Sequence, residues 1–309
     1  MEIEQELAKI TPQGETLLTI GVFDGVHAGH RYLLNRLQQQ AAKENLLSGV
    51  VTFNPHPQSV LHPGRQLPWL TDLDDRVTTL QQLGPNIVAV LTFTPKLARL
   101  SARDFMSLLR KYLKVRGIMV GLDFALGRGG EGDISLLRTL GGAMEFTVHV
   151  IPPFTIDGEV VSSTLIRQAL ARGDMRRVEK LMGRRFYLRG KVITSDKRGR
   201  LLGFPTANLD IKPQQALPDN GIYATITLVN GERFPSATNV GTSPTFGERE
   251  RRVETYLLNY KGDLYDKQLR VEFVKKVRDE QRFPSAEELI AQMGKDVQEV
   301  DAILDKDLK

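Results

Sequence analysis

The chain has 309 residues, of which 41% are hydrophobic and 26% are charged. These values are typical of a folded globular protein and exclude a collagen-like, coiled-coil or largely disordered chain. The net charge is only +5, from 42 basic and 37 acidic residues, and there is no cysteine. Disulfides, thiolate nucleophiles, iron–sulfur clusters and thiolate zinc sites are therefore excluded.

No apolar run approaches the roughly 18 residues of a membrane span, and residues 1–7 lack the apolar core of a signal peptide. We therefore expect a cytoplasmic protein without a membrane partner. The small positive excess suits anionic small molecules, whereas nucleic-acid binding usually requires a basic face. We expect no nucleic-acid partner, and the sequence predicts no oligomeric state.

The first half alternates short apolar runs with longer amphipathic segments, which predicts βα units around a doubly wound parallel sheet of Rossmann-like type. Capping-box spellings at Thr71 and Ser101 mark two helix starts. Such sheets bind ligands beyond the carboxyl ends of their strands, so we look for chemistry in the loops that follow strands. The expected strands are 17–23, 48–53, 87–93, 117–121 and 146–151, and the expected helices are 30–43, 72–83 and 102–113.

The second half has a different pattern. After a helical stretch at 168–181, the apolar runs become short and are separated by turn spellings such as Pro-Asp-Asn-Gly and Lys-Gly-Asp, which predicts an antiparallel sheet or barrel. A capping box at Ser285 opens a terminal helix that extends to residue 304. The expected domains are residues 1–184 and 185–309.

A glycine-rich turn at 21–30 connects the first expected strand to the first helix. Such a turn lets the backbone approach an anion, and the helix start offers free N–H groups. His27 and His30 would point to the same side and donate hydrogen bonds to oxygens that gain charge in phosphoryl or nucleotidyl transfer. The alternative is an incidental turn with two solvated histidines. Candidate binding residues in this turn are Gly21, Phe23, Asp24, Gly25 and Gly29.

Further candidate residues lie in three later segments of the first half. Asn54 and His56 follow one expected strand and Asp123 follows another, which places all three at a ligand-facing edge, although such loops are also ordinary. Hydroxyls followed by an arginine at a helix start can hold a triphosphate and the leaving pyrophosphate, although Ser-Ser-Thr is also a common helix cap. This last segment contains Ser162, Ser163, Thr164 and Arg167.

The turn with His27 and His30 resembles the HxGH nucleotidylyltransferase superfamily, in which two histidines stabilise the transition state at an α-phosphate. The order of motifs along nearly the whole chain is similar to that of the bifunctional prokaryotic riboflavin kinase and FMN adenylyltransferase family, often called FAD synthetase. The motifs are 21–30, 53–57, 121–127, 162–167, 199–208, 239–246, 253–258 and 263–265.

This resemblance implies a six-stranded Greek-key barrel of the riboflavin kinase type for the second half. It also implies two reactions with ATP and Mg²⁺: riboflavin is phosphorylated to FMN by the barrel, and FMN is adenylylated to FAD and pyrophosphate by the first domain. The expected partners are therefore the small molecules ATP, riboflavin and FMN.

The second half contains no histidine or cysteine, so a carboxylate is the plausible general base, and Glu254 is the leading candidate. The resemblance assigns it to the 5′-hydroxyl of riboflavin. Thr206 and Asn208 offer neutral oxygens at i and i+2, which suits a Mg²⁺ ion that keeps its waters and bridges phosphates. Without the resemblance, an ordinary strand end and an exposed strand residue are equally plausible. The remaining candidates are Gly199 and Gly203 in a loop over the phosphates, Pro205 and Asn239.

One stretch departs from the family pattern, because residues 125–132 lack its usual aromatic continuation. Their contacts with flavin or ATP therefore stay open. An alternative of another class is a non-catalytic RNA-binding protein with an OB-like barrel, which the pI near 9.3 would suit. A nucleotidylyltransferase with another acceptor is a third possibility.

Overall fold

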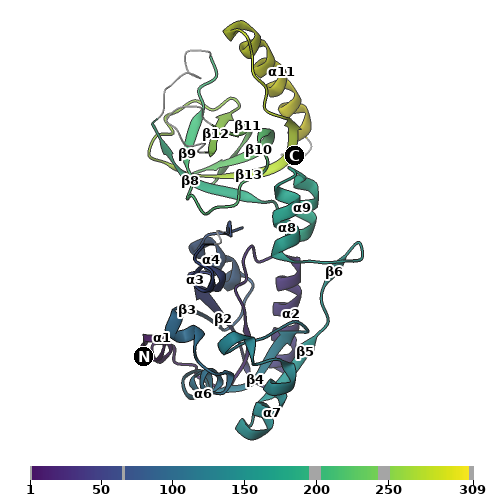
Figure 1. Cartoon of the computed structure of the whole chain (residues 1–309). Helices are drawn as coiled ribbons and strands as arrows, with labels where there is room; N and C mark the ends of the chain where they lie inside the picture. Colours follow the sequence, from purple (N-terminus) through teal and green to yellow (C-terminus); the bar gives the residue numbers. More distant parts are fainter. Residues whose placement is uncertain (1, 65–66, 195–202, 243–250, 306–309) are drawn as a thin grey trace. The chain divides into compact units, whose positions relative to one another are not determined.

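The computed structural model describes residues 2–64, 67–194, 203–242 and 251–305. The chain forms two compact units, Met1–Ser163 and Thr164–Lys309. In Figure 1 the colours begin with purple in the first unit and end with yellow in the second. The boundary predicted at residue 184 lies after two helices, α8 (Ser163–Leu170) and α9 (Met175–Met182).

The first unit is built on a five-stranded parallel sheet in the order β3-β2-β1-β4-β5. This confirms the doubly wound prediction. The strand order reverses between β1 and β4, and a crevice at such a switch point is the usual ligand site of these sheets. The strands are β1 (Thr16–Ile20), β2 (Leu47–Asn54), β3 (Ile87–Thr92), β4 (Val115–Gly121) and β5 (Thr147–Ile151), with a separate hairpin of β6 (Thr155–Ile156) and β7 (Glu159–Val160).

Helices cover both faces of this sheet. Leu17 and Leu18 are neighbours on β1 but belong to different hydrophobic clusters, because successive strand residues point to opposite faces. Leu17 packs with residues of α2 and α4, and Leu18 with residues of α1, α6 and α7. The helices are α1 (Glu2–Ala8), α2 (Ala28–Lys43), α3 (Pro57–Leu61), α4 (Leu73–Gln82), α5 (Pro95–Ala98), α6 (Ala102–Leu113) and α7 (Ile134–Met144), with a 3₁₀ turn at Arg128–Gly130.

The structure differs from the sequence-based prediction at several boundaries. Strand β1 ends at Ile20 rather than at residue 23, because Phe23 has a left-handed φ of 55°. Helix α4 is capped by Asp72, one residue after the predicted Thr71. Helix α7 was not predicted: it contains a glycine pair, and Gly141 is required because a Cβ there would lie 2.5 Å from the Phe146 carbonyl oxygen.

The second unit is a closed barrel of six antiparallel strands in the order β10-β11-β12-β9-β8-β13. This confirms the prediction of an antiparallel barrel with a terminal helix. The strands are β8 (Tyr187–Ile193), β9 (Ala207–Asp210), β10 (Gly221–Val229), β11 (Glu232–Thr242), β12 (Arg251–Leu257) and β13 (Gln268–Arg278), and the last helix is α11 (Ala286–Leu304).

Helix α11 lies along the outside of the barrel (Figure 1). Val300 and Leu304 of α11 belong to one buried cluster with Ala224 and Ile226 of β10. The predicted cap is confirmed, since the Ser285 side chain accepts a hydrogen bond from the Glu288 backbone N. Among the described residues, none of the helices combines the length and apolar character that crossing a bilayer requires.

Candidate active sites

His27 and His30 form a stacked pair at the start of α2. His27 is the N-cap, and its Nδ1 accepts a hydrogen bond from the His30 backbone N at 3.3 Å. The ring centroids lie 3.6 Å apart and the planes meet at 18°, which confirms that both rings lie on one side. Because Nδ1 of His27 is an acceptor, the proton of the neutral ring lies on Nε2, where it can be donated to a ligand.

His30 is neutral at pH 7. Burial, together with the adjacent His27 ring, holds the pKa of His30 well below 6.5. Its Nδ1 is buried and has no hydrogen-bond partner within the described part of the chain. An unsatisfied buried nitrogen is costly, so a ligand oxygen or a bound water at this position would recover free energy.

The loop before this pair is held by hydrogen bonds between side chains and backbone N–H groups. The Asp24 carboxylate accepts hydrogen bonds from the backbone N of Leu70 at 3.0 Å and of Thr71 at 3.2 Å. The Gly25 backbone N donates to Thr71 Oγ1 at 3.1 Å. Gly25 has φ +81° and a Cβ there would lie 2.9 Å from Leu70 Cδ1, so only glycine fits. These contacts of Asp24 therefore give it a role in shaping the loop.

The segment at 161–163 lies against the same loop. Ser163 Oγ donates a hydrogen bond to the Asp24 carbonyl oxygen at 3.0 Å, and a Cβ on Gly29 would lie 3.4 Å from the Val161 carbonyl oxygen. The structure thus brings the predicted Ser163 to the histidine loop. Ser162 directly precedes it, whereas Thr164 and Arg167 lie further along α8 in the second compact unit.

Asn54, His56 and Asp123 lie at or just after the ends of strands that neighbour β1. Asn54 is the exposed last residue of β2, and His56 caps α3, with its Nδ1 accepting from the Gln58 backbone N at 3.1 Å. Asp123 is exposed two residues after β4 ends. Because β2, β1 and β4 are adjacent and parallel, all three residues lie at or after the strand ends on the edge that carries His27. Gly21 directly follows β1, and the Phe23 ring meets the His30 ring edge-on at 5.0 Å.

In the barrel, the predicted polar residues form a row across three strands. Glu254 of β12 is the register partner of Asn239 on β11 and of Asn208 on β9. Directly paired residues project from the same face of a sheet. Asn208 is buried, and Asn239 Oδ1 is a buried oxygen without a hydrogen-bond partner among the described residues. Thr206 lies just before β9 rather than within it.

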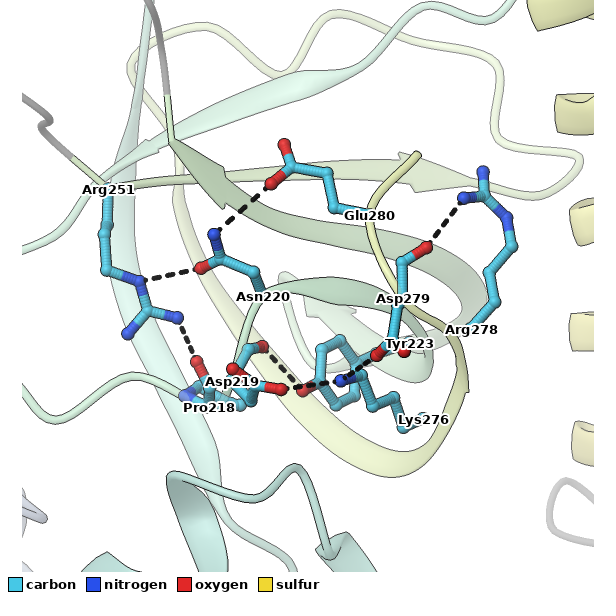
Figure 2. Close-up of polar contacts among 9 residues, drawn as sticks. All are labelled: Pro218, Asp219, Asn220, Tyr223, Arg251, Lys276, Arg278, Asp279 and Glu280. Carbon is cyan, nitrogen blue, oxygen red and sulfur yellow. Dashed lines mark hydrogen bonds and ion pairs between the residues drawn. The ribbon is translucent and has the colours of Figure 1, made fainter. Parts of the chain in front are cut away.

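A polar network that the sequence pattern did not indicate joins Arg251, Asn220 and Glu280 (Figure 2). Arg251 Nε donates to Asn220 Oδ1 at 3.1 Å, and Asn220 Nδ2 donates to Glu280 Oε2 at 3.3 Å. The other oxygen of Glu280 covers the backbone of β11, since a Cβ on Gly241 would lie 2.6 Å from it. No motif joins these residues, and only the closure of the barrel brings them together.

A second part of the network fixes the turn before β10. Lys276 Nζ contacts Asp219 at 2.8 Å and Asp279 at 2.6 Å, and the Tyr223 hydroxyl donates to the Asp219 carbonyl oxygen at 2.6 Å (Figure 2). The hydrogen bond from Lys276 lowers the pKa of the Asp219 carboxyl. Burial raises the pKa of Tyr223. At neutral pH, Asp219 is therefore charged, Tyr223 keeps its proton, and both hold the turn in place.

The two units match two different enzyme families. The FAD synthetase family matches residues 9–165, and the riboflavin kinase family matches residues 182–304. The bifunctional riboflavin kinase/FMN adenylyltransferase of Escherichia coli K12 is 40% identical over 287 residues, which are 92% of this chain and 91% of that protein. The chain belongs to the bifunctional riboflavin kinase/FMN adenylyltransferase family.

Other similar proteins also match this chain over nearly its whole length. The Bacillus subtilis (strain 168) bifunctional riboflavin kinase/FMN adenylyltransferase is 33% identical and covers 93% of this chain and 92% of its own. A crystal structure titled as a macrolide-efflux protein from Streptococcus pneumoniae has a TM-score of 0.87 at 27% identity and covers 96% of both chains. The efflux named in that title differs from the activities that the two family matches indicate here.

Membership of this family makes the chain an enzyme with riboflavin kinase and FMN adenylyltransferase activities. The RNA-binding alternative is therefore not favoured, and the acceptor of the nucleotidyl group is FMN. Enzymes of both kinds, which act on ATP, generally require a divalent metal ion.

The described residues contain no group of three or more histidine, aspartate or glutamate side chains that could hold a metal ion. The barrel offers a different donor set, the neutral oxygens of Asn208, which is the register partner of Glu254, and of Thr206, two residues earlier in the chain. This set fits a hard cation that keeps several waters and takes its other ligands from ATP. Gly203 and Pro205 are exposed just before it. Gly199 lies outside the described residues, as do residues 243–246 of the later motif.

Proposed function

We propose that FMN is adenylylated at the carboxyl edge of the parallel sheet, between the loops after β1 and β4. A phosphate oxygen of FMN attacks the α-phosphate of ATP, and the bond to the β-phosphate breaks with release of pyrophosphate. His27 and His30 donate hydrogen bonds to the oxygens that gain charge in this step. The observation that carries this assignment is the stacked histidine pair at the N-terminus of α2.

We assign the other candidates of the first domain to the same reaction. Ser162, Ser163, Thr164 and Arg167 bind the triphosphate and the leaving pyrophosphate, which Arg167 neutralises. Asn54, His56 and Asp123 contact the flavin or the nucleotide from the neighbouring loops. The histidine loop itself supplies Gly21, Phe23, Asp24, Gly25 and Gly29, and the contacts of Asp24 support a shaping role for that residue.

We propose that riboflavin is phosphorylated along the row Asn208–Glu254–Asn239 of the barrel. Glu254 accepts the proton of the 5′-hydroxyl of riboflavin, whose oxygen attacks the γ-phosphate of ATP while ADP leaves. Thr206 and Asn208 would hold Mg²⁺, which neutralises phosphate charge when bound. Gly199, Gly203, Pro205 and Asn239 bind the phosphates or the flavin. We keep the domain boundary at residue 184, near the start of the riboflavin kinase match.

A time course tests both assignments. The purified full-length chain is incubated with riboflavin, ATP and MgCl₂, and the flavins are separated by chromatography. FMN that rises first, followed by FAD, is the expected result, and EDTA should abolish both products until Mg²⁺ is restored. FMN without FAD would overturn the assignment of the first domain. Flavin binding without any product would overturn both.

A further inference from the structure

A buried arginine lies beneath the first active site, and neither the motifs nor the proposed mechanism use it. Arg76 projects from α4 and is only 5% exposed. Arginine is almost never fully buried unless it is paired. Its two terminal nitrogens bind different carbonyl oxygens: Nη1 donates to Val22 at 3.0 Å, and Nη2 donates to Phe53 at 2.9 Å.

Each of these carbonyls lies at the base of one active-site loop. Val22 lies in the loop that leads from the end of β1 to His27, two residues after the strand ends, and Phe53 directly precedes Asn54 at the end of β2. The rigid fork of a guanidinium can hold two such acceptors at a fixed separation, whereas the single ammonium of lysine cannot reproduce that geometry. Arg76 is therefore a brace between the two loops.

The guanidinium keeps its charge in this position. Burial lowers the pKa of Arg76, and the carboxylates of Asp24 and Asp72 oppose that shift. An arginine side chain does not lose its proton in proteins. Its Nε is buried and has no hydrogen-bond partner within the described ranges. A buried cation is costly, and the hydrogen bonds of this one join two backbone carbonyls of different loops, which is better explained by the placement of loops than by stability alone.

We propose that Arg76 is a positioning residue for FMN adenylylation, which sets the spacing between the loop of His27 and the loop of Asn54 and His56. The inference rests on the proposed roles of these loops. A transition state is stabilised only by donors already at the correct distance. Loss of the brace therefore lowers kcat more than it weakens the binding of ATP.

The test uses the full-length enzyme with Arg76→Lys, which keeps the charge and most of the volume. We expect kcat for FMN adenylylation to fall by about 10- to 100-fold, the cost of an ångström-scale misplacement, with KM for ATP changed less than about threefold. Riboflavin phosphorylation, measured in the same sample, should stay unchanged. The matched control is Arg103→Lys at an exposed position of α6, which should leave both activities unchanged.

Three outcomes would overturn the inference: an unchanged kcat per folded molecule, a change confined to KM, or equal loss of both activities. If Arg76→Lys does not fold, the same kinetic measurement is made on Thr52→Val. Thr52 Oγ1 also donates a hydrogen bond to the Val22 carbonyl oxygen, at 2.9 Å, and so also joins β2 to the loop of His27. The kcat of this variant for adenylylation should fall several-fold, and an unchanged kcat would contradict the brace. His27→Ala separates the two hypotheses: continued FAD formation would refute the proposed site itself, whereas loss in His27→Ala with none in Arg76→Lys would refute only the brace.

Discussion

The two units assemble their candidate sites in different ways. In the parallel sheet, several candidates lie at the end of a strand or in the loop after it, and the parallel arrangement brings the ends of β2, β1 and β4 to one edge. In the barrel, Asn208, Asn239 and Glu254 lie within three different strands and are brought side by side by strand register. The first site therefore depends on loop placement, and the second on the pairing of strands.

The largest expected effect comes from removing the base of the barrel site. Glu254→Gln keeps the shape of the side chain but cannot accept a proton, so riboflavin phosphorylation should fall by about 10²- to 10⁴-fold. Added FMN should still be adenylylated at the wild-type rate. The measurement is the initial rate of each half-reaction. Glu232→Gln, at an exposed position of β11, is the matched control and should change neither rate.

The parallel-sheet site should show the reciprocal pattern. His27→Ala removes a hydrogen-bond donor at the start of α2 and should lower FMN adenylylation by about 10²- to 10³-fold. FMN should then accumulate from riboflavin at the wild-type rate, as measured by chromatography. His62→Ala, at an exposed position, is the control. An equal loss of both activities in folded His27→Ala protein would contradict the comparison.

Much of the fold could be predicted from local patterns. The βα alternation, the caps at Ser101 and Ser285 and the turn-rich second half lead directly to the observed sheet, helices and barrel. The stacking of His27 and His30 follows from their spacing at a helix start. Helix α7 was missed because its glycine pair lowers the helix propensity of the segment, although Leu137, Leu140 and Met144 keep a helical spacing.

Contacts that depend on tertiary structure were missed. The link from Arg251 through Asn220 to Glu280 joins residues on separate strands and turns, and no spacing rule connects them. For Arg76 a weak signal exists, because it lies four residues before the buried Leu80 on the inner face of α4. A charged residue on an apolar stripe is a reason to search for a buried acceptor.

A smaller effect should distinguish the stability of the two units. Asp296 is 5% exposed and accepts hydrogen bonds from Arg278 Nε at 2.9 Å and Nη2 at 2.7 Å. Asp296→Ala removes the carboxylate partner of this arginine and should lower the free energy of unfolding of the barrel unit by about 3 kcal/mol. Denaturant-induced unfolding of the wild type and of each variant, from which the free energy of unfolding is obtained, checks this prediction. Asp301→Ala, exposed on the same helix, should have almost no effect.

The smallest expected effect is a pH dependence confined to the first unit. Because the pKa of His30 is lowered in the folded chain, the unfolded chain binds more protons below pH 6.5. The free energy of unfolding is therefore not reduced by His30 above pH 6.5, and it falls as the pH drops below that value. We would measure the free energy of unfolding of wild type and His30→Gln between pH 7.5 and 5. It should change less steeply with pH in the variant, and identical slopes for the two proteins would contradict this prediction.

The central claim is that one chain carries two separable phosphate chemistries. The most direct measurement mixes Glu254→Gln and His27→Ala proteins with riboflavin, ATP and MgCl₂ and follows FAD over time. Neither variant alone should convert riboflavin to FAD at an appreciable rate, whereas the mixture should do so through FMN released by one protein and adenylylated by the other. A mixture that makes no FAD, although each variant retains its remaining half-reaction, would contradict the account.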